Sequence, residues 1–172
     1  MMKRLLLAAA VSLLTAGSAL AQTVYIVRHA EKADASADPA LSEAGHARAA
    51  ALAEALRDAH PVLVLTSPLQ RTRLTATPTA EYHSAPVEAV SLEGGGAAHI
   101  AAAVARVRAL PADATVLIVG HSNTVPAIAR ALGYADAADM PECEYDRMTV
   151  LHLMGDAAHG MVSRYGAPTT CD

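Results

Sequence analysis

The sequence contains no phenylalanine and no tryptophan, and tyrosine occurs only five times. A hydrophobic core must therefore be filled mainly by Ala, Val and Leu, and 53% of the 172 residues are hydrophobic. The chain also lacks any run of basic residues, and its formal net charge is −4. Because nucleic-acid binding depends on clustered positive charge, we predict no nucleic-acid partner.

Cysteine is nearly absent, with only Cys143 and Cys171 in the chain. Neither lies in a Cys-x-x-Cys or metal-ligand spacing. The sequence also has no His-x-x-x-His pair, no clustered Asp pair and no P-loop glycine pattern, so we expect neither a metal nor a cofactor. In an exported protein the two cysteines can form a disulfide that pins the C-terminal tail, and two unrelated thiols are the alternative.

One long apolar run occurs, and it lies at the N-terminus. Basic residues 3–4 precede apolar residues 5–14, and the small residues of Ala19-Leu20-Ala21 follow. This order is typical of a secretory signal peptide, residues 1–21, with cleavage after Ala21. A membrane anchor is the alternative, but the run is short for a membrane span. We expect a single exported domain over residues 22–172, periplasmic in a Gram-negative source and otherwise secreted, with no stable membrane span.

Short apolar segments alternate with Ala-rich segments through the first three quarters of the mature chain. The apolar ones are expected to be strands: residues 24–27, 62–65, 87–90 and 115–119. The Ala-rich ones are expected to be helices: residues 42–59, a second after residues 66–71, 97–110, and a fourth from residues 124–126. We expect Pro78 to kink or end the second helix.

This order of strands and helices predicts the fold class. It predicts an α/β three-layer sandwich with a mostly parallel central sheet and helices on both faces. Residues 148–153 and 161–164 flank a turn region at residues 155–160. They are expected to add a C-terminal antiparallel hairpin or edge to the sheet.

Candidate catalytic residues follow the ends of the predicted strands. In chain order these residues are Arg28 and His29, then Arg71, then Glu93, and then His121. Ligands of open parallel sheets bind outside the carboxyl ends of the strands. We therefore expect Arg28, His29, Arg71 and His121 to share one pocket.

Two arginines and two histidines suit an anionic ligand. Guanidinium groups donate in a planar, bidentate geometry that matches phosphate oxygens. A neutral histidine can attack phosphorus when one ring nitrogen is held by a backbone carbonyl and the other is free. We expect His29 to be this nucleophile, while Arg28, Arg71 and His121 stabilise charge on the phosphoryl oxygens.

Four segments together carry a family resemblance: "VRHAEK", "LSEAGHARAAALA", "TSPLQRTRLTA" and "VGHSNT". In this order they resemble the histidine phosphatase superfamily, the phosphoglycerate-mutase-like proteins, over nearly the whole mature chain. The resemblance implies that His29 is phosphorylated during turnover. It also implies that Arg28, Arg71 and His121 form the phosphate pocket.

The resemblance is weakest for the proton donor. In one branch of the family a carboxylic acid follows the second histidine, but this chain has Ser122 there. In the mutase branch a glutamate follows the third strand, and Glu93 matches it by position, so Glu93 is the candidate acid. The alternative is that Glu93 is a solvated loop residue. Small phosphohistidine phosphatases of the superfamily lack an obvious acid, which would favour substrates with good leaving groups.

Residues beside these motifs have supporting roles. We expect Glu31 to orient the pocket arginines and Lys32 to lie at the rim. Asn123 can bind substrate phosphate or cap the next helix, and capping is the favoured role of Thr124.

Connections at the ligand edge are short and leave no room for a large cap domain. The sequence therefore predicts an exported, metal-independent phosphomonoesterase that forms a phosphohistidine on His29 and then hydrolyses it with water. Its expected partner is a phosphorylated substrate, either a small ester or an envelope-linked phosphate. Two alternatives remain: a non-catalytic phosphate-binding module of the same fold, and a scaffold with a structural role in the envelope.

Overall fold

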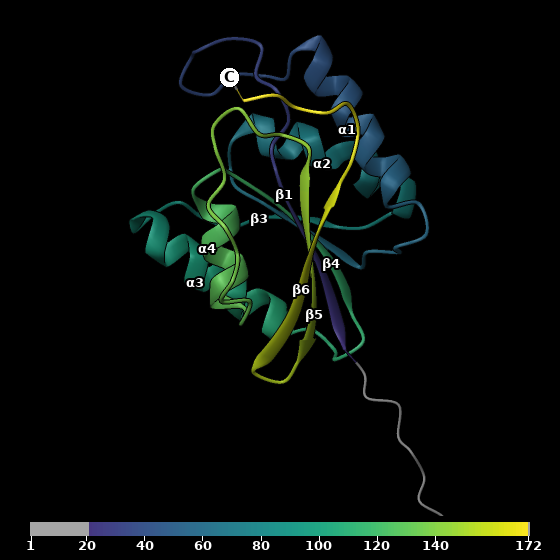
Figure 1. Cartoon of the computed structure of the whole chain (residues 1–172), viewed down its shortest axis with the longest axis vertical. Helices are drawn as coiled ribbons and strands as arrows, with labels where there is room; N and C mark the ends of the chain where they lie inside the picture. The colour runs from purple at the N-terminus through teal and green to yellow at the C-terminus, as the bar shows by residue number, and fades with distance from the viewer. Residues whose placement is uncertain (1–20, 172) are drawn as a thin grey trace, which may run out of the picture.

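The computed structural model describes residues 21–171, so the predicted signal peptide lies outside the described residues except for Ala21. A twisted sheet forms the middle layer, with α1 and α2 on one face and α3 and α4 on the other (Figure 1). The predicted α/β three-layer sandwich is confirmed.

Six strands form the sheet, in the order β3-β2-β4-β1-β5-β6. The strands are β1 (Gln22–Arg28), β2 (Leu63–Thr66), β3 (Val87–Ala89), β4 (Thr115–Gly120), β5 (Arg147–Met154) and β6 (Ala157–Arg164). The helices are α1 (Glu43–Ala55), α2 (Gln70–His83), α3 (Gly95–Arg108) and α4 (Thr124–Ala131).

Strands β1 to β4 are mutually parallel, so their carboxyl ends meet at one edge. Strand β5 runs antiparallel to β1, and β6 runs antiparallel to β5, which confirms the predicted C-terminal hairpin. The hairpin turn is tighter than the sequence suggested, because β6 begins at Ala157. Gly155 provides the positive φ of 62° that this tight turn needs.

The central strand β4 shows how the two cores form. Val116 and Ile118 lie in the cluster that includes Ala103 of α3, Ile128 of α4 and other buried side chains. The alternate residues, Leu117 and Val119, lie in the other cluster, with α1 and α2. A strand buried on both faces reads as a continuous apolar run, as the segment TVLIV does.

Helix α1 begins where the sequence places its cap. The Ser42 hydroxyl accepts a hydrogen bond from the Gly45 amide at 3.1 Å, which satisfies one of the first free N–H groups of the helix. Helix α2 continues through Pro78 to His83, so the expectation that this proline could end the helix is wrong. In the turn before this proline, the Thr77 hydroxyl donates to the Arg73 carbonyl at 2.9 Å.

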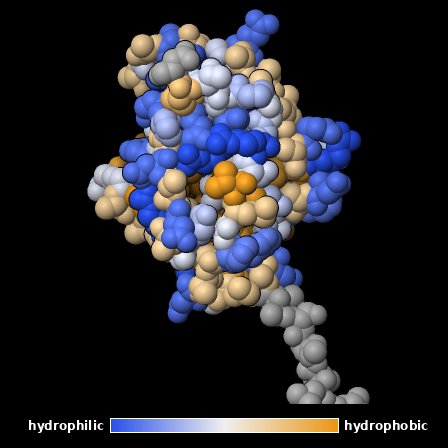
Figure 2. Space-filling view, viewed as in Figure 1, coloured by the Kyte–Doolittle hydropathy of each residue, from blue (hydrophilic) through white to orange (hydrophobic). Residues whose placement is uncertain are grey.

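The hairpin side of the molecule has a mixed surface. Figure 2 shows a mostly hydrophilic or weakly apolar face with one small, strongly hydrophobic patch. The large hydrophobic side chains exposed on the hairpin are Met154, Met161 and Val162. Within residues 21–171, no helix has both the length and the hydrophobicity to cross a bilayer.

Candidate active site

Strand register brings the two predicted site histidines together. Arg28 of β1 pairs with Gly120 of β4, so the residues that follow, His29 and His121, leave the sheet side by side. The His29 amide donates to the Gly120 carbonyl at 2.9 Å, and the two imidazole centroids are 5.3 Å apart. Residues separated by more than ninety positions in the chain thus meet because their strands are neighbours.

The neighbouring strand β2 contributes the second arginine. Its carboxyl end leads through Ser67 to α2, and Arg71 lies in the first turn of that helix. The Ser67 hydroxyl lies 3.0 Å from Nε2 of His121 and orients that ring. On Arg71, Nε and Nη1 are buried and have no hydrogen-bond partner, although Nη1 lies 3.9 Å from an oxygen of Asp38.

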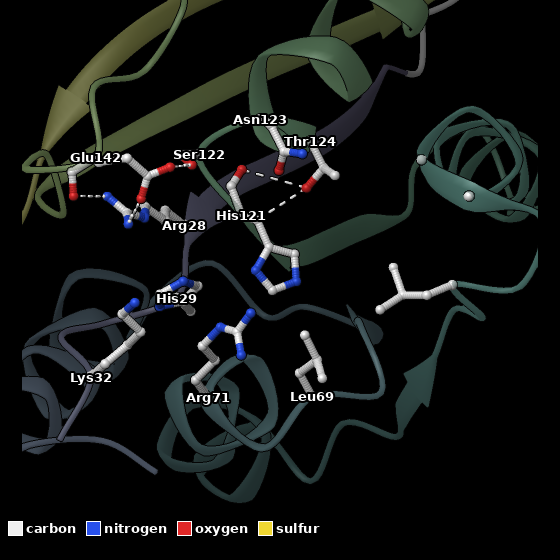
Figure 3. A pocket seen from close by; sticks show the side chains of 13 residues that line it. Arg28, His29, Lys32, Leu69, Arg71, His121, Ser122, Asn123, Thr124 and Glu142 are labelled. Carbon is white, nitrogen blue, oxygen red and sulfur yellow. Dashed lines mark hydrogen bonds and ion pairs between the residues drawn. The ribbon is translucent and has the colours of Figure 1, made fainter. Parts of the chain in front are cut away.

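These side chains line a pocket of about 540 Å³ at the carboxyl edge of the sheet. Figure 3 shows the imidazole rings of His29 and His121 and the Arg71 guanidinium around a common space. The structure therefore brings together the four residues that were expected to share one pocket, Arg28, His29, Arg71 and His121. The lining residues are Arg28, His29, Lys32, Leu69, Arg71, Leu92, Gly95, Gly96, His121, Ser122, Asn123, Thr124 and Glu142.

His29 lies at the floor of the pocket, with only 4% of its surface exposed. Its Nδ1 is 2.7 Å from the Ala30 carbonyl oxygen, which can only accept a hydrogen bond, so Nδ1 carries the proton. Burial, assisted by the charges of Arg28 and Arg71, lowers the pKa of His29 to about 4. At neutral pH the ring is therefore uncharged, and its lone pair lies on Nε2.

His121 is held in the same state. Burial is the main cause that lowers its pKa to about 3, and His29 and Arg71 add to the effect. A neutral imidazole beside His29 acts as a hydrogen-bonding group. Fixed positive charge in this pocket comes from the arginines, with Lys32 exposed at the rim.

Arg28 is buried and enclosed by the loop of residues 141–145. Its Nη1 donates to the carbonyls of Pro141, Glu142 and Glu144, and its Nη2 lies 2.6 Å from a carboxylate oxygen of Glu142. The Tyr145 ring covers the guanidinium, with its centroid 4.2 Å from Cζ. Its Nε is buried without a partner. The sequence placed Arg28 at the site but gave no sign of this loop.

Glu142 is the pocket residue that sequence reasoning missed. One carboxylate oxygen accepts from Arg28 and the other accepts from the Ser122 hydroxyl (Figure 3). The Ser122 hydrogen bond lowers the pKa of Glu142, and the nearby charge of Arg28 adds to this, so the group is ionised at neutral pH. Its segment carries no family motif, and only the fold shows that it reaches the pocket.

Glu93 is not brought to the pocket. Its neighbours Leu92 and Gly95 line the cavity, whereas Glu93 itself is exposed and is not among the lining residues. The arrangement therefore gives no support to Glu93 as the proton donor.

The expectation for Glu31 is wrong. Its carboxylate forms a bidentate pair with Arg48 of α1, at 2.6 to 3.0 Å, and no hydrogen bond joins it to Arg28 or Arg71. Arg48 also donates to the carbonyls of Tyr165 and Ala167. The ion pair joins α1 to the segment after β1, and the carbonyl contacts of Arg48 join α1 to the C-terminal segment.

Asn123 and Thr124 do not cap α4 through their side chains in the way that the sequence suggested. Asn123 occupies the N-cap position of α4 without a side-chain capping bond, and it lines the pocket. The Thr124 hydroxyl accepts from the His121 amide at 2.9 Å and so fixes the turn that carries the histidine. Gly120 fits tightly here, because a Cβ at that position would lie 2.8 Å from the Thr124 hydroxyl oxygen.

The two cysteines form the predicted disulfide, Cys143–Cys171. It ties the loop that encloses Arg28 to the C-terminal tail. A second link joins the same parts, since Asp146 accepts from the Thr169 hydroxyl at 2.6 Å. Across residues 21–171, no group of three or more His, Cys, Asp or Glu side chains is placed to hold a metal ion.

Known proteins resemble this chain in sequence and in fold. A sequence model described as the histidine phosphatase superfamily (branch 1) matches residues 24–91. A solved structure from Nakamurella multipartitia, described as a candidate phosphohistidine phosphatase SixA, is 30% identical with a TM-score of 0.60. That match covers 86% of this chain and 96% of the other. A comparison with curated protein sequences gave no match.

Two more distant structures share the fold. The protein histidine phosphatase SixA complexed with tungstate is 19% identical, with a TM-score of 0.64, over 83% of this chain and 96% of that one. A mycobacterial glucosyl-3-phosphoglycerate phosphatase is 17% identical, with a TM-score of 0.60, over 86% of this chain and 100% of that one.

Proposed function

The chain belongs to the histidine phosphatase superfamily (branch 1), and we propose that it hydrolyses phosphate esters through a phosphohistidine on Nε2 of His29. In the first step Nε2 attacks phosphorus, the bond to the leaving group breaks, and the phosphoryl group remains on the imidazole. In the second step water attacks phosphorus, and phosphate is released. The protein supplies its own cations for both steps.

The observation that carries this proposal is the state of His29. Its Nδ1 proton is held by the Ala30 carbonyl, and burial keeps the ring neutral, so Nε2 is a nucleophile at neutral pH. It lies in a pocket that also contains Arg71, whose buried Nε and Nη1 have no hydrogen-bond partner. Buried donors without a partner are costly, and phosphate oxygens would satisfy them.

The charge that develops on the phosphoryl oxygens needs donors already in place. Arg28 is fixed by the loop of residues 141–145 and Arg71 by the first turn of α2. An incoming phosphate also favours the protonated form of His121, because a nearby anion raises a histidine pKa. Together these three side chains would bind the transferring group throughout in-line displacement.

The pocket suits substrates with good leaving groups. Glu142 is ionised, and no protonated acid lines the described pocket, so an alkoxide leaving group would receive little assistance. Phenolic esters are one expected substrate class, because a phenolate leaves without prior protonation. Phosphohistidine is the other, because its imidazole leaves as a neutral ring. The similarity to a candidate phosphohistidine phosphatase SixA, at 30% identity, supports this proposed substrate class.

We also propose that the chain is exported. The signal-peptide pattern of residues 1–21 supports this, as does the disulfide, because such bonds persist in oxidising compartments.

The test is hydrolysis of p-nitrophenyl phosphate by residues 22–172 in the presence of a metal chelator. We expect activity in the native chain and its loss in His29→Ala. The matched control is His46→Ala, since His46 is exposed on α1, outside the pocket. A native chain that binds phosphate without turnover would instead indicate a non-catalytic binding module.

A further inference from the structure

Glu142 is the only carboxylate among the described residues that line the pocket. It comes from the loop before β5, whereas the other charged lining residues, Arg28, Lys32 and Arg71, lie at the end of β1 or in the segments that follow β1 and β2. The Glu142 side chain is 79% exposed, while His29 is 4% exposed. The pocket therefore has a nucleophile at its floor and a carboxylate at its mouth.

The position of Glu142 matters because displacement at phosphorus is in line, which fixes the direction from which water attacks. When His29 carries the phosphoryl group, water must attack from the side opposite Nε2, which is the side of the pocket mouth. A water molecule arriving there passes Glu142, whose carboxylate can accept its proton. Lys32, the other charged residue at the rim, has an ammonium group that cannot accept one.

The carboxylate is also held in place. Arg28 and Ser122 each donate to one of its oxygens. Its neighbour Cys143 is bonded to Cys171, and Asp146, directly after the loop, binds Thr169. An exposed side chain on an anchored backbone can keep its position at the mouth and still exchange protons with solvent.

Resting on the proposed function, we propose that Glu142 is the general base for hydrolysis of the phosphohistidine. The water oxygen forms a bond to phosphorus, and the bond between phosphorus and Nε2 of His29 breaks. The bonding electron pair returns to the imidazole, the water proton moves to the Glu142 carboxylate, and solvent then removes it. The group is ionised before the step, as a base must be.

A base for the second step has a kinetic signature that a purely structural role lacks. In Glu142→Gln the first step with p-nitrophenyl phosphate stays fast, because this leaving group needs no proton. The second step should slow by about 10²-fold or more. We expect a burst of one p-nitrophenol per enzyme and accumulation of acid-labile phosphohistidine.

The matched control is Glu93→Gln, which changes an exposed glutamate outside the pocket and should show native turnover without a burst. Formate added to Glu142→Ala should restore turnover, since a free carboxylate can replace the base.

Three outcomes separate the hypotheses. Native turnover without a burst in Glu142→Gln would overturn the role of Glu142. A raised KM with no phosphoenzyme would also overturn it and show that Glu142 only positions Arg28. Absence of phosphohistidine from the native chain and every variant, with activity retained in His29→Ala, would instead refute the proposed function.

Discussion

Removal of the Cys143–Cys171 disulfide should destabilise the fold and loosen the proposed phosphate site. The perturbation is the double variant Cys143→Ser, Cys171→Ser. The two residues are 28 positions apart. In the chain-entropy description, a closed loop of that length stabilises the folded state by about 3–4 kcal/mol. The variant should lose an amount of this order from its free energy of unfolding.

Urea unfolding followed by far-UV circular dichroism measures this loss, since the chain has no tryptophan for a fluorescence assay. The comparison is between the oxidised native chain and the double variant. Reductant should lower the stability of the native chain and leave the double variant unchanged, which controls for general effects of the reagent.

The functional consequence follows from the loop. Cys143 lies between Glu142 and Glu144, whose carbonyls accept hydrogen bonds from Arg28. A loosened loop should raise KM for p-nitrophenyl phosphate, by about tenfold if one charged hydrogen bond of ~1.5 kcal/mol is lost. If the variant keeps both its stability and its KM, the reasoning that the disulfide anchors the site is refuted.

Three further predictions concern single side chains. Arg71→Lys should raise the inhibition constant of inorganic phosphate at least tenfold, because an ammonium cannot replace the planar guanidinium. Glu31→Gln should cost about 3 kcal/mol in urea unfolding, because it leaves buried Arg48 without its counter-charge. For His29, the native pKa of about 4 lies below the unfolded value near 6.5. The native state then binds fewer protons between these values, so stability falls as pH drops through this window, by about 2 kcal/mol from pH 7 to 5.

Each of these has its own control. Arg73→Lys changes an exposed arginine on the same helix and should leave phosphate inhibition unchanged. Glu43→Gln, at an exposed position in α1, should leave unfolding nearly unchanged. The acid sensitivity of His29→Gln should be smaller than that of the native chain, and an equal slope in both would contradict the assigned pKa.

Much of the fold could be predicted because burial leaves a clear pattern in this chain. The continuous apolar segment of β4 reveals a strand covered on both faces, and Ser42 marks the start of α1 through its capping hydroxyl. The alternative that Pro78 ends the second helix was wrong, because α2 continues past the proline and its Ala80 packs in the core cluster. Such tertiary support cannot be read from local propensity.

The two pocket histidines could also be located in advance. His29 and His121 follow apolar strands, and parallel strands present their carboxyl ends at one edge. By contrast, Glu93 was chosen by its position after β3, yet its side chain is exposed outside the pocket. Proximity along the chain to a strand end does not determine where a side chain points.

The sequence by itself determined the α/β class and the edge of the sheet at which the candidate site lies. It also identified four residues of the pocket: Arg28, His29, Arg71 and His121. These follow from strand patterns and local motifs, which are properties of short segments. Only the tertiary structure decided that Glu142 closes over Arg28, because that contact joins positions 114 residues apart. The contact depends on how the loop before β5 folds back over the edge of the sheet. The local sequence of the loop does not predict its conformation.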